Sequence, residues 1–191
     1  MWTKECPGLR AKNSYTGHIP NVFIALGSNI HPEKNLTEAA SLLRKCWPAI
    51  RFSSVYRTAP AKVTDQPDFL NAVAAFESKE SPETIAKRLQ TIETKLKKAP
   101  PYRFGPRTID LDLLLYENTI LSEERLAVSG ERSANNLIIP HPRMHERRFV
   151  LEPLCELMDA KQIHPVLGKT WENLLKDTAN QRCERIDFVW P

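Results

Sequence analysis

The chain of 191 residues is 41% hydrophobic and 26% charged, a composition typical of a soluble globular protein with one core of ordinary size. Its net charge of +4 is only mildly basic and favours an anionic small ligand over a long polyanion such as a nucleic acid. The four cysteines form no C-x-x-C pair, which argues against a zinc site or a disulfide scaffold, and no stretch approaches the roughly 18 apolar residues of a membrane span.

Residues 1–20 contain two prolines, two glycines and an asparagine, and no apolar run of signal-peptide length. We therefore predict a flexible extension at 1–20 and a single domain over 21–191. The scattered cysteines fit a reducing compartment, so we expect a cytoplasmic protein that uses neither a membrane nor a nucleic acid as its partner.

Strand and helix signals then follow one another in a regular order. In chain order they predict a strand at 22–26, a helix from Pro32 to about Trp47, strands at 50–57 and 69–77, a helix from Ser81 to just before Pro100, and a strand at 108–116. This β-α-β-β-α-β order is typical of a ferredoxin-like α+β domain, here with additional helices toward the C-terminus. The polar stretch 122–136 predicts a surface insertion.

Two carboxylates stand on the last predicted strand. Because side chains alternate along a strand, the apolar residues should share one face and the aspartates the other, with Ile109, Leu111, Leu113 and Leu115 opposite Asp110 and Asp112. Two ionised carboxylates this close repel each other, so the pair indicates a bound cation or a role in proton transfer. The guanidinium groups of Arg103 and Arg107, just upstream, suit phosphate. These arginines favour the cation. An exposed strand face that happens to carry aspartates is the plainer alternative.

Phe69 and Asn71 stand two positions apart on a predicted strand and should therefore share a face. A ring and an amide in that arrangement can stack on a flat heterocycle and read its hydrogen-bonding edge. For this pair alone, a core phenylalanine beside a turn asparagine is the commoner arrangement.

A cluster of basic side chains lies in the segment 139–149, which contains His141, Arg143, His145, Arg147 and Arg148, followed by Phe149. The histidines do not form an H-E-x-x-H motif, so phosphate contact is favoured over metal binding. The chain has no G-x-x-x-x-G-K-[ST] and no G-x-G-x-x-G motif, so a nucleotide would not be held by a glycine-rich phosphate loop.

Five blocks stand out together: Val22 to Asn29, Ser53 to Thr58, Asp65 to Asn71, Gly105 to Asp112 and Ile139 to Met144. In this order they resemble the 6-hydroxymethyl-7,8-dihydropterin pyrophosphokinases of folate biosynthesis, over about residues 21–160, and the Gly-Pro-Arg-Thr-Ile-Asp-Leu-Asp block is the most specific of them. The resemblance implies a ferredoxin-like α+β fold. It also implies an enzyme that transfers the intact diphosphate of ATP to the hydroxymethyl group of the pterin and leaves AMP.

The same resemblance implies a role for particular residues. Asp110 and Asp112 would bind two Mg²⁺ ions and act in catalysis with Arg103 and Arg107. The pterin would be contacted by Thr58, Ala59, Phe69, Asn71 and Phe149, with the two phenylalanine rings enclosing it. ATP would be contacted by Gln90, Glu93, Lys98, Arg103, Arg107, Leu113, His141 and Arg147. Family members fused to dihydropteroate synthase imply such an enzyme as a fused or associated partner.

The chain departs from the family at Lys97-Lys98-Ala99-Pro100, where Gly-Arg-x-Arg is usual, and lysine cannot reproduce the bidentate contact of arginine. Two other functions stay open from the residues themselves. A single-stranded RNA-binding module would use a similar sheet, although no RNP1-like segment occurs on the predicted strands. A metal-dependent nuclease would use Asp110 and Asp112 but leaves Phe69 and Asn71 unexplained.

Overall fold

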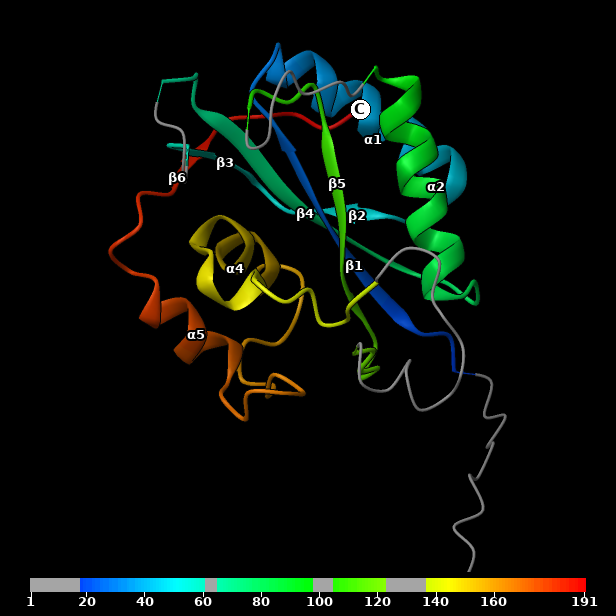
Figure 1. The fold of residues 1–191 in the computed structure, drawn as a ribbon, viewed down its shortest axis with the longest axis vertical. Coiled ribbons are helices and arrows are strands. Elements are labelled where there is room, and N and C mark those ends of the chain that lie inside the picture. The colour runs from blue at the N-terminus through cyan, green and yellow to red at the C-terminus, as the bar shows by residue number, and fades with distance from the viewer. Residues whose placement is uncertain (1–17, 61–64, 98–104, 123–136) are drawn as a thin grey trace, which may run out of the picture.

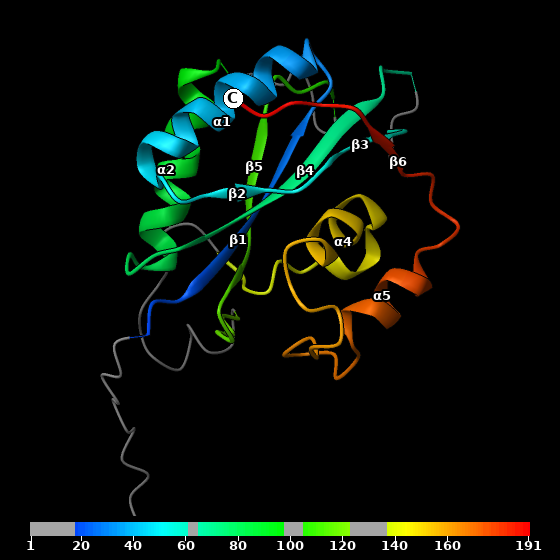
Figure 2. The same cartoon turned by 180° about the vertical axis from the view of Figure 1, so that it is seen from behind.

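A computed structural model describes residues 18–60, 65–97, 105–122 and 137–191. One sheet is covered by helices on both faces, as Figure 1 and, from behind, Figure 2 show. One layer holds α1 (Pro32–Cys46) and α2 (Pro82–Lys95), and the other holds α4 (Arg148–Cys155) and α5 (Trp171–Asp177). Among the described residues no helix is long and apolar enough to cross a membrane.

The sheet is antiparallel throughout, in the order β5-β1-β4-β3-β6. Its strands are β1 (Asn21–Ser28), β2 (Arg51–Phe52), β3 (Val55–Thr58), β4 (Phe69–Glu77), β5 (Asp110–Tyr116) and β6 (Glu184–Ile186), and β2 pairs with β4 beside β3. From β1 to β5 the elements confirm the predicted β-α-β-β-α-β order when β2 and β3 are counted together as the one strand predicted at 50–57.

Side-chain alternation along the central strands produces two hydrophobic cores. In β1, Val22 and Ile24 pack in the core under α1 and α2, whereas Phe23 packs in the core under α4 and α5. The helix starts follow their predicted signals: a proline opens both α1 and α2, and the Ser81 hydroxyl accepts the N–H of Thr84 at 3.3 Å to cap α2. Among the described residues, helices thus cover much of both faces of the sheet.

The strand predicted at 50–57 is interrupted, because Ser53 and Ser54 separate β2 from β3. The Ser53 hydroxyl accepts the N–H of Val73 at 3.0 Å, a bond that a backbone carbonyl would receive in a regular ladder. Serine side chains compete in this way with the backbone for its hydrogen bonds. The result is a one-residue shift in the register with β4, since Phe52 pairs with Ala74 but Tyr56 pairs with Asn71.

The prediction that Leu115 shares a face with Leu113 is wrong. The register between β1 and β5 shifts, with Ile24 opposite Leu113 but Phe23 opposite Leu115, so Leu114 is an extra residue in the ladder. Such a bulge reverses the alternation. Leu114 and Leu115 therefore both join the core under α4 and α5, while Tyr116 returns to the first core.

The tail of the chain forms a strand that the sequence did not predict. In β6, Glu184 and Arg185 are exposed, so the strand has no alternation of apolar residues from which it could be predicted. It nevertheless pairs with β3 at the edge of the sheet. Beyond it the Trp190 ring stacks on Phe52 with centroids 4.5 Å apart, and its indole N–H donates to the Ser53 carbonyl at 2.8 Å.

The structure describes only a small part of the predicted N-terminal extension and of the predicted insertion, namely residues 18–20 and residue 122. Most of both, 1–17 and 123–136, lies outside the described residues. Residues 18–20 are held by the domain: the Pro20 carbonyl accepts the N–H of Ser78 at 3.0 Å, and His18 approaches Glu117 to 3.4 Å.

Glu93 joins α2 to β5, since its buried carboxylate accepts the N–H of Leu111 at 2.7 Å. In the Glu93→Ala variant this N–H would be left unpaired in the core, and we expect the free energy of unfolding to fall by about 1–3 kcal/mol. Glu93→Gln keeps an oxygen acceptor and should lose less. Urea titration measures both, and an alanine variant as stable as the wild type would contradict the anchoring role.

Candidate functional site

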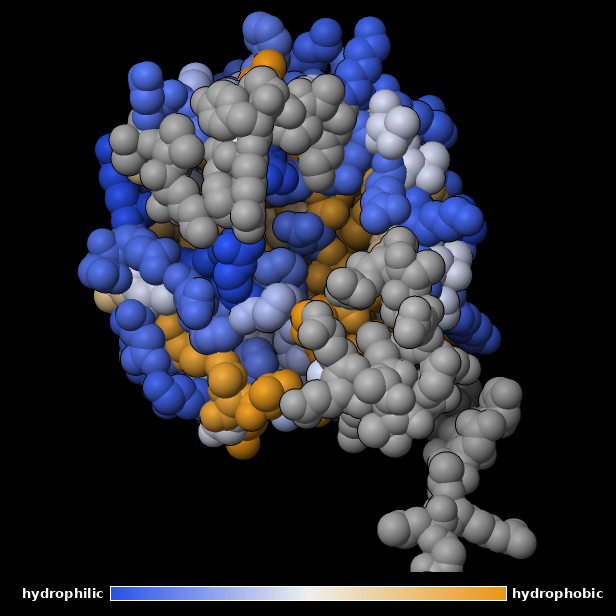
Figure 3. Space-filling view, in the orientation of Figure 1, coloured by the Kyte–Doolittle hydropathy of each residue, from blue (hydrophilic) through white to orange (hydrophobic). Residues whose placement is uncertain are grey.

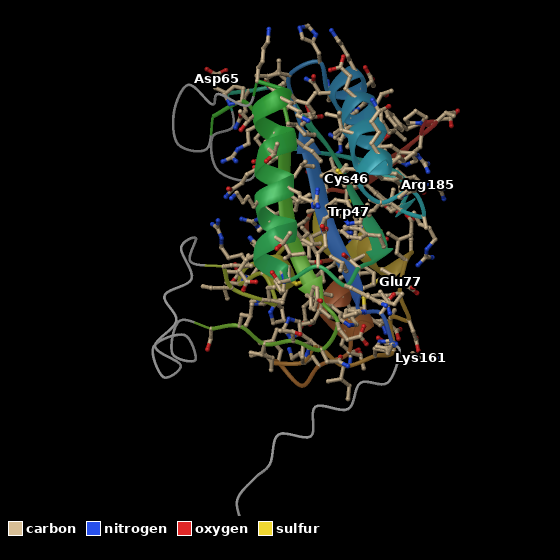
Figure 4. All side chains as sticks on the ribbon, turned by 90° about the vertical axis from the view of Figure 1, so that its right-hand side faces the viewer. Cys46, Trp47, Asp65, Glu77, Lys161 and Arg185 are labelled. Atoms are coloured by element: carbon tan, nitrogen blue, oxygen red, sulfur yellow. The ribbon has the colours of Figure 1, made fainter. Side chains whose placement is uncertain are left out.

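A cavity of about 400 Å³ opens at one end of the sheet, on the face covered by α4. Gly27, Thr58, Phe69 and Asp110, each at the end of a different strand, line it together with residues of the segment 141–150. In Figure 4 the labelled Asp65 marks this end of the molecule and Lys161 the opposite end. In Figure 3, which has the orientation of Figure 1, hydrophilic side chains gather at the place of α4, left of the centre of the view.

The two aspartates of β5 line the cavity, as their alternation predicted. Asp112 pairs with Ala25 and Asp110 with Gly27 across the β1–β5 ladder, so small residues of β1 lie beside both carboxylates. The Arg107 guanidinium donates to Asp110 at 2.8 Å. A carboxylate pair and an arginine thus face the same space.

Further basic groups form another wall of the cavity, to which the structure brings His141, Arg143 and Arg147. The His141 N–H donates to the Leu114 carbonyl at 2.9 Å, which fixes this segment against the edge of β5. Burial, and then the charges of Arg147 and Arg143, lower the pKa of His141 to about 4. Burial and Arg143 also lower the pKa of Arg147, which the two aspartates partly offset. The wall is strongly electropositive and already partly desolvated.

Aromatic and amide groups occupy the remaining side. Phe69 and Asn71 of β4 and Phe149 of α4 line the cavity, and the Asn71 amide donates to the Thr58 hydroxyl at 2.8 Å. Gly27 leaves room for this pair, because a Cβ there would lie 3.0 Å from Asn71 Oδ1. Rings and a held amide in one cavity suit a planar ligand with polar edges.

Asn29 joins the two halves of the site, a role that the sequence did not reveal. Its side-chain oxygen accepts the N–H of Arg107 at 2.7 Å, and its amide donates to Gln66 and to the Pro67 carbonyl, each at 3.1 Å. Gln66 lines the cavity, and Asn29 is buried. The loop before β4 and the segment before β5 are therefore held together by one amide.

Not every predicted residue reaches the cavity. Gln90 is exposed on α2, Glu93 is buried against β5, and the Leu113 side chain lies in the core on the other face of the sheet. Lys98 and Arg103 fall outside the described residues. The structure adds Gln66 and Arg143, which stand within motifs that the sequence had marked, and Ala59 lines the cavity as predicted.

The donor set bears on which metal could bind. Within the described ranges no group of three or more histidine, cysteine, aspartate or glutamate side chains is placed to hold a metal by itself. Two carboxylates beside an electropositive wall fit Mg²⁺, which usually takes one or two carboxylates and completes its octahedron with phosphate oxygens and water. The residues present therefore fit an ion that arrives with a phosphorylated ligand.

Comparison with known proteins identifies the family model that the chain matches, 7,8-dihydro-6-hydroxymethylpterin-pyrophosphokinase, over residues 23–159. A 2-amino-4-hydroxy-6-hydroxymethyldihydropteridine pyrophosphokinase of Haemophilus influenzae is 39% identical over 138 residues, which cover 71% of this chain and 79% of that protein. A mitochondrial folate synthesis bifunctional protein of Arabidopsis thaliana is 41% identical over 139 residues, 72% of this chain but only 23% of that protein.

Solved structures share the fold. A crystal structure described as HPPK-DHPS in complex with substrates superposes with a TM-score of 0.63 at 13% identity, covering 85% of this chain and 44% of that one. The wild-type HPPK-DHPS of Plasmodium falciparum gives a TM-score of 0.57 at 16% identity, covering 84% and 44%. The chain thus spans less than half of these longer proteins.

The depressed pKa of His141 can be observed directly. In the free protein its imidazole proton resonances should titrate with a midpoint at about 4, not at the ordinary 6.5, and His141→Asn assigns the signal. Because the folded-state pKa is the lower one, the neutral ring contributes stability above pH 6.5 that is lost as the pH falls toward 4. A midpoint near 6.5 would contradict the burial of this ring between arginines.

Proposed function

The chain belongs to the 7,8-dihydro-6-hydroxymethylpterin-pyrophosphokinase family, and from that premise we propose that it transfers the diphosphate of ATP to 6-hydroxymethyl-7,8-dihydropterin in the presence of Mg²⁺. The products are AMP and the pterin diphosphate, which serves folate biosynthesis. The observation that carries the proposal is one cavity that joins a carboxylate pair and basic side chains to two phenylalanines and an amide.

The charged side chains of the cavity would bind the triphosphate of ATP. Arg107 and Arg147 line the cavity and would neutralise phosphate oxygens, and Arg143 would add a third guanidinium. His141 enters as a neutral hydrogen-bonding group because its pKa of about 4 leaves it uncharged near neutral pH. Such transfer depends mainly on alignment and charge stabilisation, so fixed cations in a partly desolvated wall are the principal contribution of the protein.

Asp110 and Asp112 are the residues that would hold Mg²⁺. The ion, when bound, would supply charge neutralisation at phosphate oxygens. Arg107 already pairs with Asp110 at 2.8 Å. A triphosphate that brings its own cation would therefore meet both partners of this ion pair, and Arg107 would turn from the carboxylate to the phosphate.

The aromatic side of the cavity would bind the pterin. Phe69 and Phe149 offer ring faces, Asn71 reads the polar edge of the heterocycle, and the Thr58 hydroxyl fixes the orientation of that amide. A nuclease built on the two aspartates would have no use for this side of the cavity, and an RNA-binding sheet would meet repulsion from the carboxylates.

Other assignments rest on the resemblance and the relatives alone. Gln90, Glu93, Lys98, Arg103 and Leu113 are assigned to ATP in this way. The two-enzyme relatives support a dihydropteroate synthase, fused or separate, as the partner that receives the product. The dispersed cysteines support a reducing compartment such as the cytoplasm.

Product analysis tests the reaction and the metal site together. With Mg-ATP and the reduced pterin the wild type should release AMP and no ADP. Asp110→Asn and Asp112→Asn should each lower turnover by at least about 100-fold without unfolding the protein, since one carboxylate ligand is lost while the apolar face of β5 is unchanged. Asp187→Asn removes an exposed carboxylate away from the cavity and serves as the control. ADP as the product, or near-normal turnover by either cavity variant at saturating Mg²⁺, would refute the proposal.

Removal of the rings should separate the two substrates. Phe69→Ala and Phe149→Ala should each weaken pterin binding by about 1–3 kcal/mol, the range found for a base stacked on an aromatic side chain, and should affect nucleotide binding much less. Phe188→Ala removes a partly buried ring outside the cavity and should change neither affinity. Isothermal titration measures both ligands, and equal losses for the pterin and the nucleotide would assign the rings to the core instead.

A further inference from the structure

Arg147 and Phe149, which the proposed function assigns to ATP and the pterin, emerge from a break between two helical segments. The 3-10 helix η1 (Met144–Glu146) ends immediately before Arg147, and α4 begins immediately after it. Arg147 itself is extended, with φ −125° and ψ 107°. This short extended step turns the Arg147 guanidinium toward the cavity, where it lies 5.5 Å from the centre of the Phe149 ring.

A break between helices leaves backbone groups without helical partners. The N–H groups of the first turn of a helix need outside acceptors, and the N-cap side chain usually supplies one. Here the N-cap residue is Arg147, and it makes no side-chain capping bond. The Arg148 N–H and the Glu146 carbonyl, on either side of Arg147, therefore depend on groups from elsewhere in the chain.

One side chain satisfies both groups. The amide oxygen of Gln181 accepts the Arg148 N–H at 2.9 Å, and its NH₂ group donates to the Glu146 carbonyl at 2.8 Å. Gln181 is itself held in the turn after α5, because its N–H donates to the Thr178 carbonyl at 3.0 Å. The Arg148 side chain adds a bond to the Ala179 carbonyl at 3.1 Å in the same turn.

We propose that Gln181 is a positioning residue for catalysis, which fixes the backbone on both sides of Arg147 and so aims Arg147 and Phe149 into the cavity. The inference rests on the proposed function, since it gives these two side chains their substrates. Gln181 lies beyond the segment 23–159 that matches the family model. The tail of this chain would then complete the site from outside that segment.

The alternative is that Gln181 merely fastens the tail to α4. The two roles differ in what they affect: fastening alters the stability of the fold, whereas positioning alters kcat/KM in a protein that is fully folded. A positioning role also requires that the effect pass through Arg147.

The test compares Gln181→Met, which keeps the length of the side chain without its hydrogen bonds, with Arg182→Met. Arg182 is the neighbouring residue, and its exposed side chain pairs with Glu184 at 3.0 Å. At a temperature where both variants are folded by circular dichroism, Gln181→Met should lower kcat/KM for Mg-ATP roughly tenfold, because small misplacements of a substrate-binding group are costly. Arg182→Met should match the wild type.

A double-mutant cycle then shows whether the effect passes through the arginine. In an Arg147→Ala background, adding Gln181→Met should change kcat/KM for Mg-ATP by less than about twofold, since coupled residues are not additive. Amide hydrogen exchange at Arg148 should become faster in Gln181→Met, whatever the activity, because that N–H loses its acceptor.

These measurements separate the possible failures. A folded Gln181→Met variant with wild-type kcat/KM, an additive effect in the cycle, or unchanged exchange at Arg148 would overturn the positioning role while leaving the proposed function in place. A wild-type protein that forms no AMP from Mg-ATP and the pterin would overturn the proposed function itself, and the inference with it.

Discussion

The burial of one face of β5 is the constraint on which the site depends. Leu111 and Leu113 pack in the core on the side of α1 and α2, so strand alternation sends Asp110 and Asp112 to the other face, where the cavity lies. The Glu93 bond to the Leu111 N–H secures β5 under α2. A shift of β5 by one residue in its register would turn both carboxylates into the core. The cost of burying them therefore fixes the register and the face on which they lie.

The basic wall of the cavity depends on segments far away in the chain. The His141 N–H bonds to the carbonyl of Leu114, the extra residue of the bulge, so the irregularity of β5 and the docking of the basic segment occur at one point. Gln181 then secures the far end of that segment from the tail. The bond to β5 and the Gln181 side chain thus hold the backbone of the short stretch from which His141, Arg143, Arg147 and Phe149 reach the cavity.

Local sequence patterns predicted those features of the fold that depend on strand alternation and helix capping. The strand expected at 69–77 has those bounds, and the aspartate pair and the Phe69–Asn71 pair each line the cavity from one strand face. What the sequence did not reveal depends on single hydrogen bonds between distant residues. The bulge at Leu114, the edge strand β6 and the roles of Asn29 and Gln181 have no periodic signal, because polar or isolated residues create them only once the chain has folded.

The single cavity should accept a triphosphate and a planar heterocycle at the same time. Simultaneous binding can be tested by calorimetric titration of the reduced pterin into protein saturated with Mg²⁺ and a non-hydrolysable ATP analogue. We expect the pterin to bind in a 1:1 ratio with the nucleotide still in place, at least as tightly as it binds without nucleotide. Mutual displacement of the two ligands would contradict the claim.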